Sequence, residues 1–251
     1  MDSNKVKIVI LAAGKGKRMQ SELPKVLVKV GGKTMIGHLL ESIKDVFSKK
    51  PIAIVGHKMD FIKSELGDSC IYVEQKEQLG TGHAVSCAEE VCGNAEHIVV
   101  LSGDQPFISS TTIKNLMDRH LRSDAIITLT TTRVPDFEDW RNVFLAFGRI
   151  LRESGKVVGI REYKDANEKE KNIKEVNAGC YVFDAIWLWK HLRQVENKNA
   201  QKEYYLTDLI KMATEEKARI KSIDIDMREA LGANSKEELD ILENFVTIGE
   251  L

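Results

Sequence analysis

A nearly continuous apolar run close to the N-terminus ends in a loop that contains two glycines. The run spans residues 5–13, and Gly14 and Gly16 follow it. Such a run indicates a strand that is buried on both faces, as in a parallel sheet covered by helices. Open sheets of this kind bind ligands beyond the carboxyl ends of their strands, so residues 11–19 are the first candidate site.

The rest of the first half alternates strand-length apolar runs with segments of helical period. Further strands are expected at residues 51–55, 70–73 and 98–101. Helices are expected at residues 35–47, with Thr34 as the cap, and at residues 59–66, 83–91 and 113–121. This order predicts an α/β, Rossmann-like fold with a mixed, mainly parallel sheet and helices on both faces.

The second half predicts an antiparallel extension of that sheet. Strands are expected at residues 125–131, 147–152, 156–162, 175–183 and 220–225, and helices at residues 186–195, 206–213 and 235–246. Residues 167–174 are expected to form a charged loop. We predict one main domain, residues 1–228, made of a first lobe of about residues 1–123 and a second lobe of about residues 124–228. Residues 229–251 would form a C-terminal segment and helix.

Charge and cysteine usage narrow the class of protein. With 37 basic and 38 acidic side chains the formal net charge is −1, so no broad basic surface for nucleic acid is expected. The four cysteines form no C-x-x-C pair and are interpreted as free thiols, which with the lack of a leader pattern predicts a cytoplasmic protein. The first apolar run is too short to span a bilayer, so no membrane association is expected.

The glycine-containing loop favours an anionic ligand. Its backbone amides can surround a phosphate, and Lys15, Arg18 and Lys25 add positive charge. Two common motifs are excluded, because a dinucleotide fingerprint needs a glycine where Met19 stands and no P-loop G-K-[ST] is present. On the loop alone, a basic turn without a ligand remains an equal alternative.

Five ordered motifs resemble those of sugar-nucleotide pyrophosphorylases, and most closely the uridyltransferase half of bifunctional N-acetylglucosamine-1-phosphate uridyltransferases. The first is L-A-A-G-K-G-x-R-M with L-P-K at residues 23–25. The others are E-Q-L-G-T-G-H-A at 77–84, S-G-D-Q-P at 102–106, G-R-I to E-Y-K-D-A at 148–166, and E-V-N-A-G at 175–179 with E-Y-Y-L-T-D at 203–208. The resemblance covers nearly the whole chain.

The resemblance implies a role for particular residues. The nucleotide would be held by Leu11, Ala12, Ala13, Gly14, Lys25, Gln75, Gly80 and Thr81. Catalytic charge would come from Arg18 and Lys25, and Mg²⁺ would be bound by Asp104 and Asn234. The sugar would be contacted by Gly148, Glu162 and Asn177. The implied substrates are UTP and a sugar 1-phosphate, and the implied reaction is uridylyl transfer to N-acetylglucosamine 1-phosphate.

This chemistry suits the residue types. The nucleophile is a phosphate oxygen that is already anionic, so the difficulty is to bring two polyanions together and to stabilise the charge that develops. Two cationic side chains and a Mg²⁺ with oxygen ligands meet that need. No strong general base is required.

Each assignment has a structural alternative. Asp104 could shape a turn before Pro106, and Asn234 has capping-box spacing to Glu237 before the last helix. Lys25 could be a solvated surface lysine, and Glu162 could be a strand-face charge paired with Arg161 or Lys164. Gln75 and Asn177 could be edge polar groups, and His83 is more simply explained as part of a helix start.

The sequence also departs from the family pattern. Lys17 stands where threonine is usual, Ser102 replaces a common tyrosine, and residues 142–147 replace a stretch near the sugar, which leaves the sugar open. The family's left-handed β-helix, which acetylates glucosamine 1-phosphate and forms a trimer, has no counterpart hexapeptide repeats here, so no acetyltransferase activity is expected. The oligomeric state is left open.

Three other functions remain as alternatives. The chain could use another hexose 1-phosphate or another nucleotide, or it could be a catalytically silent binder of sugar nucleotides. A dinucleotide-dependent oxidoreductase is disfavoured by Met19.

Overall fold

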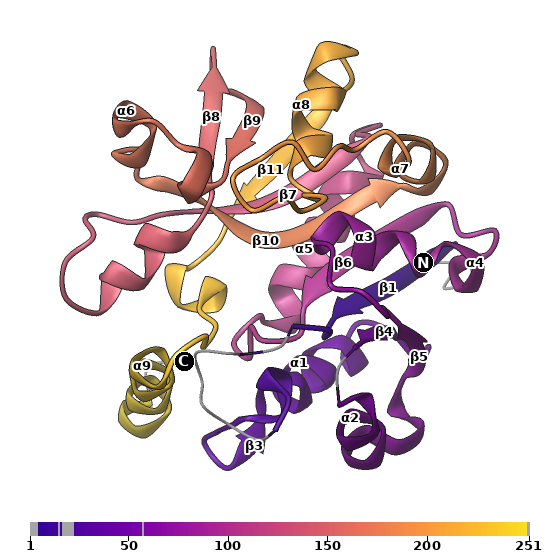
Figure 1. Ribbon diagram of the computed structural model, residues 1–251, viewed down its shortest axis with the longest axis vertical. Coiled ribbons are helices and arrows are strands. Elements are labelled where there is room, and N and C mark those ends of the chain that lie inside the picture. The colour runs from indigo at the N-terminus through magenta and orange to yellow at the C-terminus, as the bar shows by residue number, and fades with distance from the viewer. Residues whose placement is uncertain (1–4, 15, 17–22, 57, 250–251) are drawn as a thin grey trace.

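The centre of the structure is a mixed sheet (Figure 1). The computed structural model describes residues 5–14, 16, 23–56 and 58–249, and within these residues nine strands form one sheet. Seven of them lie in the order β11-β7-β10-β6-β1-β4-β5, and the β8–β9 hairpin joins through β10. The strands are β1 Val6–Leu11, β4 Ile52–Val55, β5 Ile71–Glu74, β6 His97–Ser102, β7 Ile127–Arg133, β8 Arg149–Glu153, β9 Lys156–Arg161, β10 Glu175–Asp184 and β11 Ile220–Asp224.

Strand direction divides the sheet into two regions. β1 pairs in parallel with β4 and β6, and β4 pairs in parallel with β5. β10 runs antiparallel to its neighbours β6 and β7, while β11 is parallel to β7. The predicted fold class is therefore confirmed. One sheet passes through both predicted lobes, and the boundaries proposed for the lobes stay predictions.

Helices cover both faces of the sheet. They are α1 Met35–Lys44, α2 Met59–Leu66, α3 Thr81–Ser86, α4 Glu89–Cys92, α5 Ser110–Leu121, α6 Glu168–Lys171, α7 Ala185–Leu192, α8 Asp208–Glu215 and α9 Lys236–Ile248. α1, α2 and α5 pack on one face, and α3, α4, α7 and α8 pack on the other. Alternation along each strand supplies both cores: Ile8 and Ile10 face the first set of helices and Val9 faces the second.

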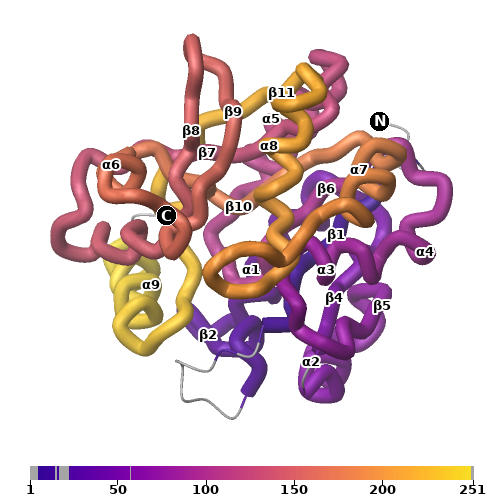
Figure 2. Tube along the Cα trace, turned by 45° about the horizontal axis from the view of Figure 1, so that its top comes forward, coloured from indigo at the N-terminus to yellow at the C-terminus, as the bar shows by residue number. Residues whose placement is uncertain are grey.

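A third apolar cluster holds the C-terminal helix against the sheet. Leu242 and Phe245 of α9 are buried with Phe144, which lies in the 3₁₀ segment η4 Asp139–Ala146, and with Val176 of β10. Figure 2 shows α9 beside β2 Lys29–Val30, which forms a small hairpin with β3 Lys33–Thr34. Helix α9 is thus packed close to the segment that follows the glycine-containing loop.

Two local expectations were wrong. Residues 167–174, expected as a loop, contain α6, because Asn167 and Glu170 form a reciprocal capping box that stabilises one helical turn. The single helix expected over residues 83–91 is divided into α3 and α4. Ser86 Oγ and Cys87 Sγ both donate to the His83 carbonyl oxygen, and such side-chain bonds compete with helical ones.

Candidate active site

A cleft of about 550 Å³ opens beyond the carboxyl ends of β1 and β6. It is where ligands bind in open α/β sheets. The residues that line it are Leu11, Ala13, Gly14, Gly16, Lys25, Val26, Gln75, Gln78, Gly80, Thr81, Ala84, Ser102, Asp104 and Glu203. Seven of the eight residues predicted to hold the nucleotide are in this set, together with one of the two predicted metal ligands.

The glycine-containing loop forms one edge of the cleft. Gly14 and Gly16 both line it. Ala12 does not, because its side chain is buried in the core and its backbone N–H donates to the Ile54 carbonyl at 2.9 Å. Arg18, predicted to be catalytic, lies outside the described residues, as do Lys15 and Lys17. Their assignments stay predictions.

Lys25 joins the two residues predicted to bind metal. Its ammonium contacts the Asp104 carboxylate in an ion pair and donates a hydrogen bond to the amide oxygen of Asn234. The Lys25 side chain is only 10% exposed, so this lysine is a buried part of the cleft and not a solvated surface group. Residues separated by more than two hundred positions in the sequence therefore meet at one point.

The segment that carries Asn234 lies tightly against Asp104. A Cβ placed on Gly232 would come within 2.7 Å of the Asp104 carbonyl oxygen, so a side chain there would push the segment away. Asn234 itself does not cap α9. Ser235 is the N-cap and accepts a hydrogen bond from the Glu238 N–H at 3.2 Å. The capping alternative for Asn234 is therefore wrong.

Gln75 and Gly80 shape the part of the cleft expected to hold the base. Gln75 is 3% exposed, and its amide nitrogen donates to the Gly80 carbonyl at 3.1 Å and lies 3.0 Å from Nδ1 of His83. Gly80 has φ +119°, and a Cβ there would lie 2.6 Å from the Tyr204 carbonyl oxygen. Only glycine allows this close approach of the 200–206 segment.

Thr81 connects the side of the cleft predicted to hold the nucleotide to the residues predicted to contact the sugar. Its hydroxyl accepts a hydrogen bond from the Leu206 N–H at 3.0 Å. The next residue, Thr207, donates from its hydroxyl to Glu162 at 2.9 Å. A short chain of contacts therefore runs from the nucleotide cleft to a residue predicted to bind the sugar.

The three residues predicted to contact the sugar lie together. The Asn177 N–H donates to the Gly148 carbonyl at 2.8 Å, and a Cβ on Gly148 would lie 3.4 Å from a Glu162 carboxylate oxygen. Asn177 Oδ1 accepts from the Tyr181 hydroxyl at 2.9 Å and from the Gly179 N–H at 3.1 Å. Asn177 is thus fixed by hydrogen bonds with Gly148, Gly179 and Tyr181, whereas a polar side chain at a sheet edge needs only water as a partner.

Glu162 lies in a negatively charged environment. Burial raises the pKa of its carboxyl, the Thr207 hydrogen bond opposes this, and nearby Asp208, Asp165 and Glu203 raise it further. No ion pair with Arg161 or Lys164 is formed within the described residues, because Arg161 pairs with Glu170 and Lys164 donates to Gln201. The alternative of a simple strand-face ion pair does not hold for this carboxylate.

Several residues around the site had not been assigned a role from sequence. Gln78 and Glu203 line the cleft. Gln105 is buried and donates from its amide to the carbonyls of Ala178 at 2.8 Å and Ala230 at 3.0 Å, joining β10 to the segment before Asn234. Glu203 and Gln105 stand inside motifs quoted above, so the sequence marked both residues as candidates. Only the fold shows what they contact.

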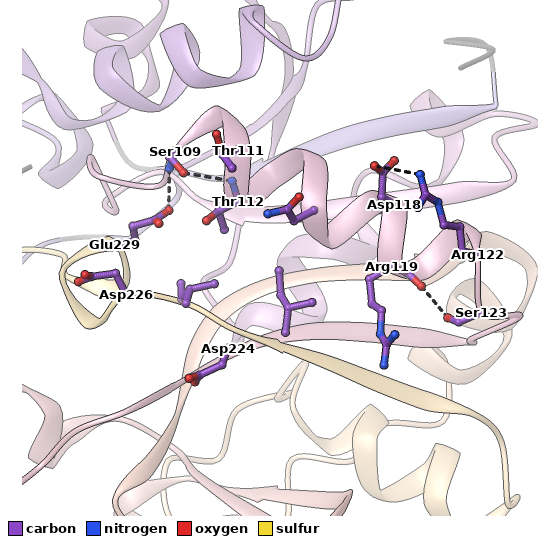
Figure 3. A pocket seen from close by; sticks show the side chains of 13 residues that line it. Ser109, Thr111, Thr112, Asp118, Arg119, Arg122, Ser123, Asp224, Asp226 and Glu229 are labelled. Atoms are coloured by element: carbon purple, nitrogen blue, oxygen red, sulfur yellow. Dashed lines mark hydrogen bonds and ion pairs between the residues drawn. The ribbon is translucent and has the colours of Figure 1, made fainter.

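A second groove, of about 600 Å³, lies away from these residues between α5 and the segment after β11. Figure 3 shows Thr111, Asp118 and Arg119 of α5 on one side and Asp224 and Asp226 on the other. It contains none of the residues predicted for nucleotide, metal or sugar.

The donor set fits a divalent cation of the magnesium type. Asp104 offers a carboxylate oxygen and Asn234 an amide oxygen, and both contact one cationic atom, Nζ of Lys25. Mg²⁺ prefers such hard oxygens and is commonly held by one or two of them with phosphate and water. Among the residues that the structure describes, no group of three or more His, Cys, Asp or Glu side chains is gathered for a metal.

The comparison with known families agrees with the geometry of the cleft. Residues 8–166 match the model of the MobA-like NTP transferase domain. The chain belongs to this family. Nucleotidyltransferases of the family typically use a divalent metal, and the resemblance inferred from the five motifs is confirmed.

Curated relatives extend the match to almost the full chain. The bifunctional protein GlmU of Streptococcus pyogenes serotype M18 is 41% identical over 238 residues, which cover 94% of this chain and 50% of that protein. GlmU of serotype M12 is also 41% identical over 94% of this chain and 56% of its own length. The chain thus spans about half the length of the curated relatives it matches.

Solved structures of low sequence identity share the fold. A UDP-glucose pyrophosphorylase in complex with UDP-glucose has a TM-score of 0.77 at 18% identity and covers 97% of this chain and 98% of its own. An apo UDP-glucose pyrophosphorylase has a TM-score of 0.76 at 17% identity and covers 98% and 100%. Within the described residues, no helix is both long and apolar enough to cross a membrane. The cytoplasmic location and the oligomeric state stay predictions.

Proposed function

We propose that this chain transfers a uridylyl group from UTP to N-acetylglucosamine 1-phosphate, with Mg²⁺, to give UDP-N-acetylglucosamine and pyrophosphate. The observation that carries the proposal is that Lys25 and Asp104 line one cleft with Gly14 and Gly80, and that Lys25 contacts both Asp104 and Asn234. A cationic side chain and two oxygen ligands at the end of a parallel strand suit a nucleoside triphosphate better than an uncharged ligand.

The reaction is an in-line displacement at the α-phosphorus. A phosphate oxygen of the sugar 1-phosphate forms the new P–O bond, the bond to the β-phosphate breaks, and pyrophosphate leaves with its electron pair. Lys25 lies where it would neutralise phosphate oxygens during this exchange. A Mg²⁺ held by Asp104 and Asn234 would supply further positive charge to the phosphates.

The sugar would lie against Gly148, Glu162 and Asn177. Glu162 is fixed by Thr207 and would accept hydrogen bonds from sugar hydroxyls. Asn177 is fixed by Tyr181 and Gly179, so its amide would be presented in one orientation. The 142–147 segment, where this chain departs from its family, packs through Phe144 beside Val176 and would influence which sugar fits.

A matrix of assays tests the substrates. Pyrophosphate release is measured for the four nucleoside triphosphates with the 1-phosphates of glucose, galactose, N-acetylglucosamine and N-acetylgalactosamine. We expect the highest kcat/KM for UTP with N-acetylglucosamine 1-phosphate. A preference for CTP or GTP would contradict uridylyl transfer. A preference for another sugar 1-phosphate would contradict the proposed sugar substrate. No pyrophosphate release from any pair would favour a catalytically silent binder.

A further inference from the structure

The carboxylate of Glu238 holds the nitrogen side of the Asn234 amide. The side-chain nitrogen of Asn234 donates to Glu238 Oε2 at 2.9 Å, and its backbone N–H donates to the same oxygen at 2.6 Å. On its other side, the amide oxygen faces Lys25 and the neighbouring Asp104 carboxylate. Every polar atom of the Asn234 side chain therefore has a defined direction.

Hydrogen-bond chemistry allows only one of the two orientations of the Asn234 amide. An ionised carboxylate only accepts hydrogen bonds, so it can bind the NH₂ of an amide but not its oxygen. An asparagine without such a partner can turn by 180° about its last bond and present NH₂ in place of oxygen. NH₂ is a donor and cannot ligate a cation. Glu238 thus selects the rotamer in which the oxygen points toward Lys25.

Helix α9 gives Glu238 a fixed position. The Glu238 N–H is bound by the Ser235 cap, so the carboxylate projects from the first turn of the helix. Further along α9, both oxygens of Glu243 accept from the Gly31 N–H at 3.1 Å. The helix lies beside β2 in Figure 2. The Glu238 carboxylate therefore projects from a helix that is anchored at both ends.

We propose that Glu238 is a positioning residue that sets the affinity of the cleft for a divalent cation by fixing the amide oxygen of Asn234. The inference rests on the proposed function, since it takes Asn234 to be a metal ligand. Groups that orient metal ligands typically change metal affinity by 10–100-fold when removed. Glu238 itself would touch neither the metal nor the substrates.

Direct metal binding tests this role. Binding of Mn²⁺ to the full chain is followed by electron paramagnetic resonance, with saturating UTP and no sugar phosphate. We expect Glu238→Ala to raise the dissociation constant of Mn²⁺ about tenfold or more. Glu238→Gln keeps an acceptor oxygen and should recover binding to within about threefold of the parent chain. Thermal unfolding by circular dichroism confirms that each variant is folded.

The matched control is Glu237→Ala. Glu237 is also an acidic residue in the first turn of α9, but it is exposed and its side chain faces Ser235. This variant changes the charge at the helix N-terminus by the same amount, so it should bind Mn²⁺ like the parent chain. In Asn234→Ala, adding Glu238→Ala should cause no further loss, because the ligand that Glu238 positions is already gone.

The outcomes separate this inference from the proposed reaction. Equal Mn²⁺ affinity in Glu238→Ala and Glu237→Ala would overturn the positioning role, as would an additive loss in the double variant. Either result would leave the transfer reaction, measured on the parent chain by pyrophosphate release, unaffected. A parent chain that binds no Mn²⁺ with UTP would overturn the inference together with the metal site.

Discussion

At the scale of single residues, the site depends on side chains whose direction is set by a second polar group. Asn234 is held by Glu238, Glu162 by Thr207, and Gln75 by the Gly80 carbonyl and His83. The resemblance to the family assigned a role to the first residue of each of these pairs. Gly80, His83 and Thr207 also stand in the quoted motifs, but which residue each of them holds was not predictable, because a hydrogen-bond partner is defined by distance in the fold.

Gln75 gives a prediction about base selectivity. Its nitrogen is directed at Gly80 and His83, and within the described residues no hydrogen bond is made to its oxygen, so the oxygen can accept from the N3–H of uracil. His83→Ala would remove one of the two groups that hold the amide nitrogen and leave only the Gly80 carbonyl, so the amide would turn more readily and offer NH₂ to cytosine. We expect the ratio of kcat/KM for UTP over CTP to fall by about tenfold or more.

The control for this measurement is Ser86→Ala, in the same helix. The Ser86 hydroxyl donates to the His83 backbone carbonyl, and among the described residues the hydrogen-bond partners of the Gln75 side-chain amide are Gly80 and His83, not Ser86. Its selectivity should equal that of the parent chain. A UTP to CTP ratio unchanged by His83→Ala would show that His83 only starts α3.

His120 predicts a dependence of stability on pH. Burial, with a smaller contribution from His97, lowers the pKa of His120 from 6.5 to about 4. Because the folded pKa is depressed, the unfolded chain binds a proton more readily between these values. Stability is therefore full above about pH 6.5 and falls as the pH drops toward 4, by roughly 3 kcal/mol at most from this group.

Urea unfolding at pH 7.5 and pH 5 measures this effect. His120→Gln removes the titrating group while keeping a side chain that can reach Thr128, which lies 3.0 Å from the His120 ring. The difference in unfolding free energy between the two pH values should shrink in this variant. An equal difference in unfolding free energy between the two pH values in both proteins would show that a group other than His120 causes the acid sensitivity.

At the scale of elements, short polar anchors hold the segments around the site. The Arg149 side chain is fully buried and donates to the backbone carbonyls of Phe144, Leu145, Phe147 and Lys171. It joins η4 and α6 to β8, next to Gly148, which is predicted to contact the sugar. Burial lowers the pKa of this guanidinium, so its hydrogen bonds offset a real desolvation cost.

We expect Arg149→Met to lower the free energy of unfolding by about 3 kcal/mol or more, since it removes the Arg149 hydrogen bonds from four carbonyls, of which the Phe144 carbonyl keeps the Phe147 N–H. Urea denaturation measures the change. Arg161→Met is the control: Arg161 forms a partly exposed pair with Glu170, and its loss should cost less than about 1 kcal/mol. Similar losses in the two variants would contradict the anchoring role.

The β2–β3 turn tests the contact with α9. Gly31 and Gly32 both have positive φ, but only at Gly31 would a Cβ meet another side chain, Val246 at 2.7 Å. Gly31→Ala and Gly32→Ala therefore share the backbone strain and differ in the clash. We expect Gly31→Ala to be the less stable of the two by about 1–3 kcal/mol in thermal unfolding. Equal stability would mean that α9 moves aside freely.

At the scale of the whole molecule, the sequence predicted the fold class well and the arrangement less well. Continuous apolar strands such as β1 and β6 were evident because both of their faces are buried. The insertion of β10 between β6 and β7 was not, since strand order depends on contacts between distant residues. The convergence of Lys25 with Asn234 follows from that same long-range packing.

The convergence of Lys25, Asp104 and Asn234 is proposed to carry nucleotidyl transfer. It is tested most directly by pyrophosphate release from UTP and N-acetylglucosamine 1-phosphate, with Mg²⁺ or with EDTA, in the parent chain and in Asp104→Asn, which keeps the side-chain shape and removes the charge. We predict Mg²⁺-dependent release by the parent chain and a rate lower by about 10²-fold or more in the folded variant. Equal release by both proteins, or release that persists in EDTA, would contradict the account.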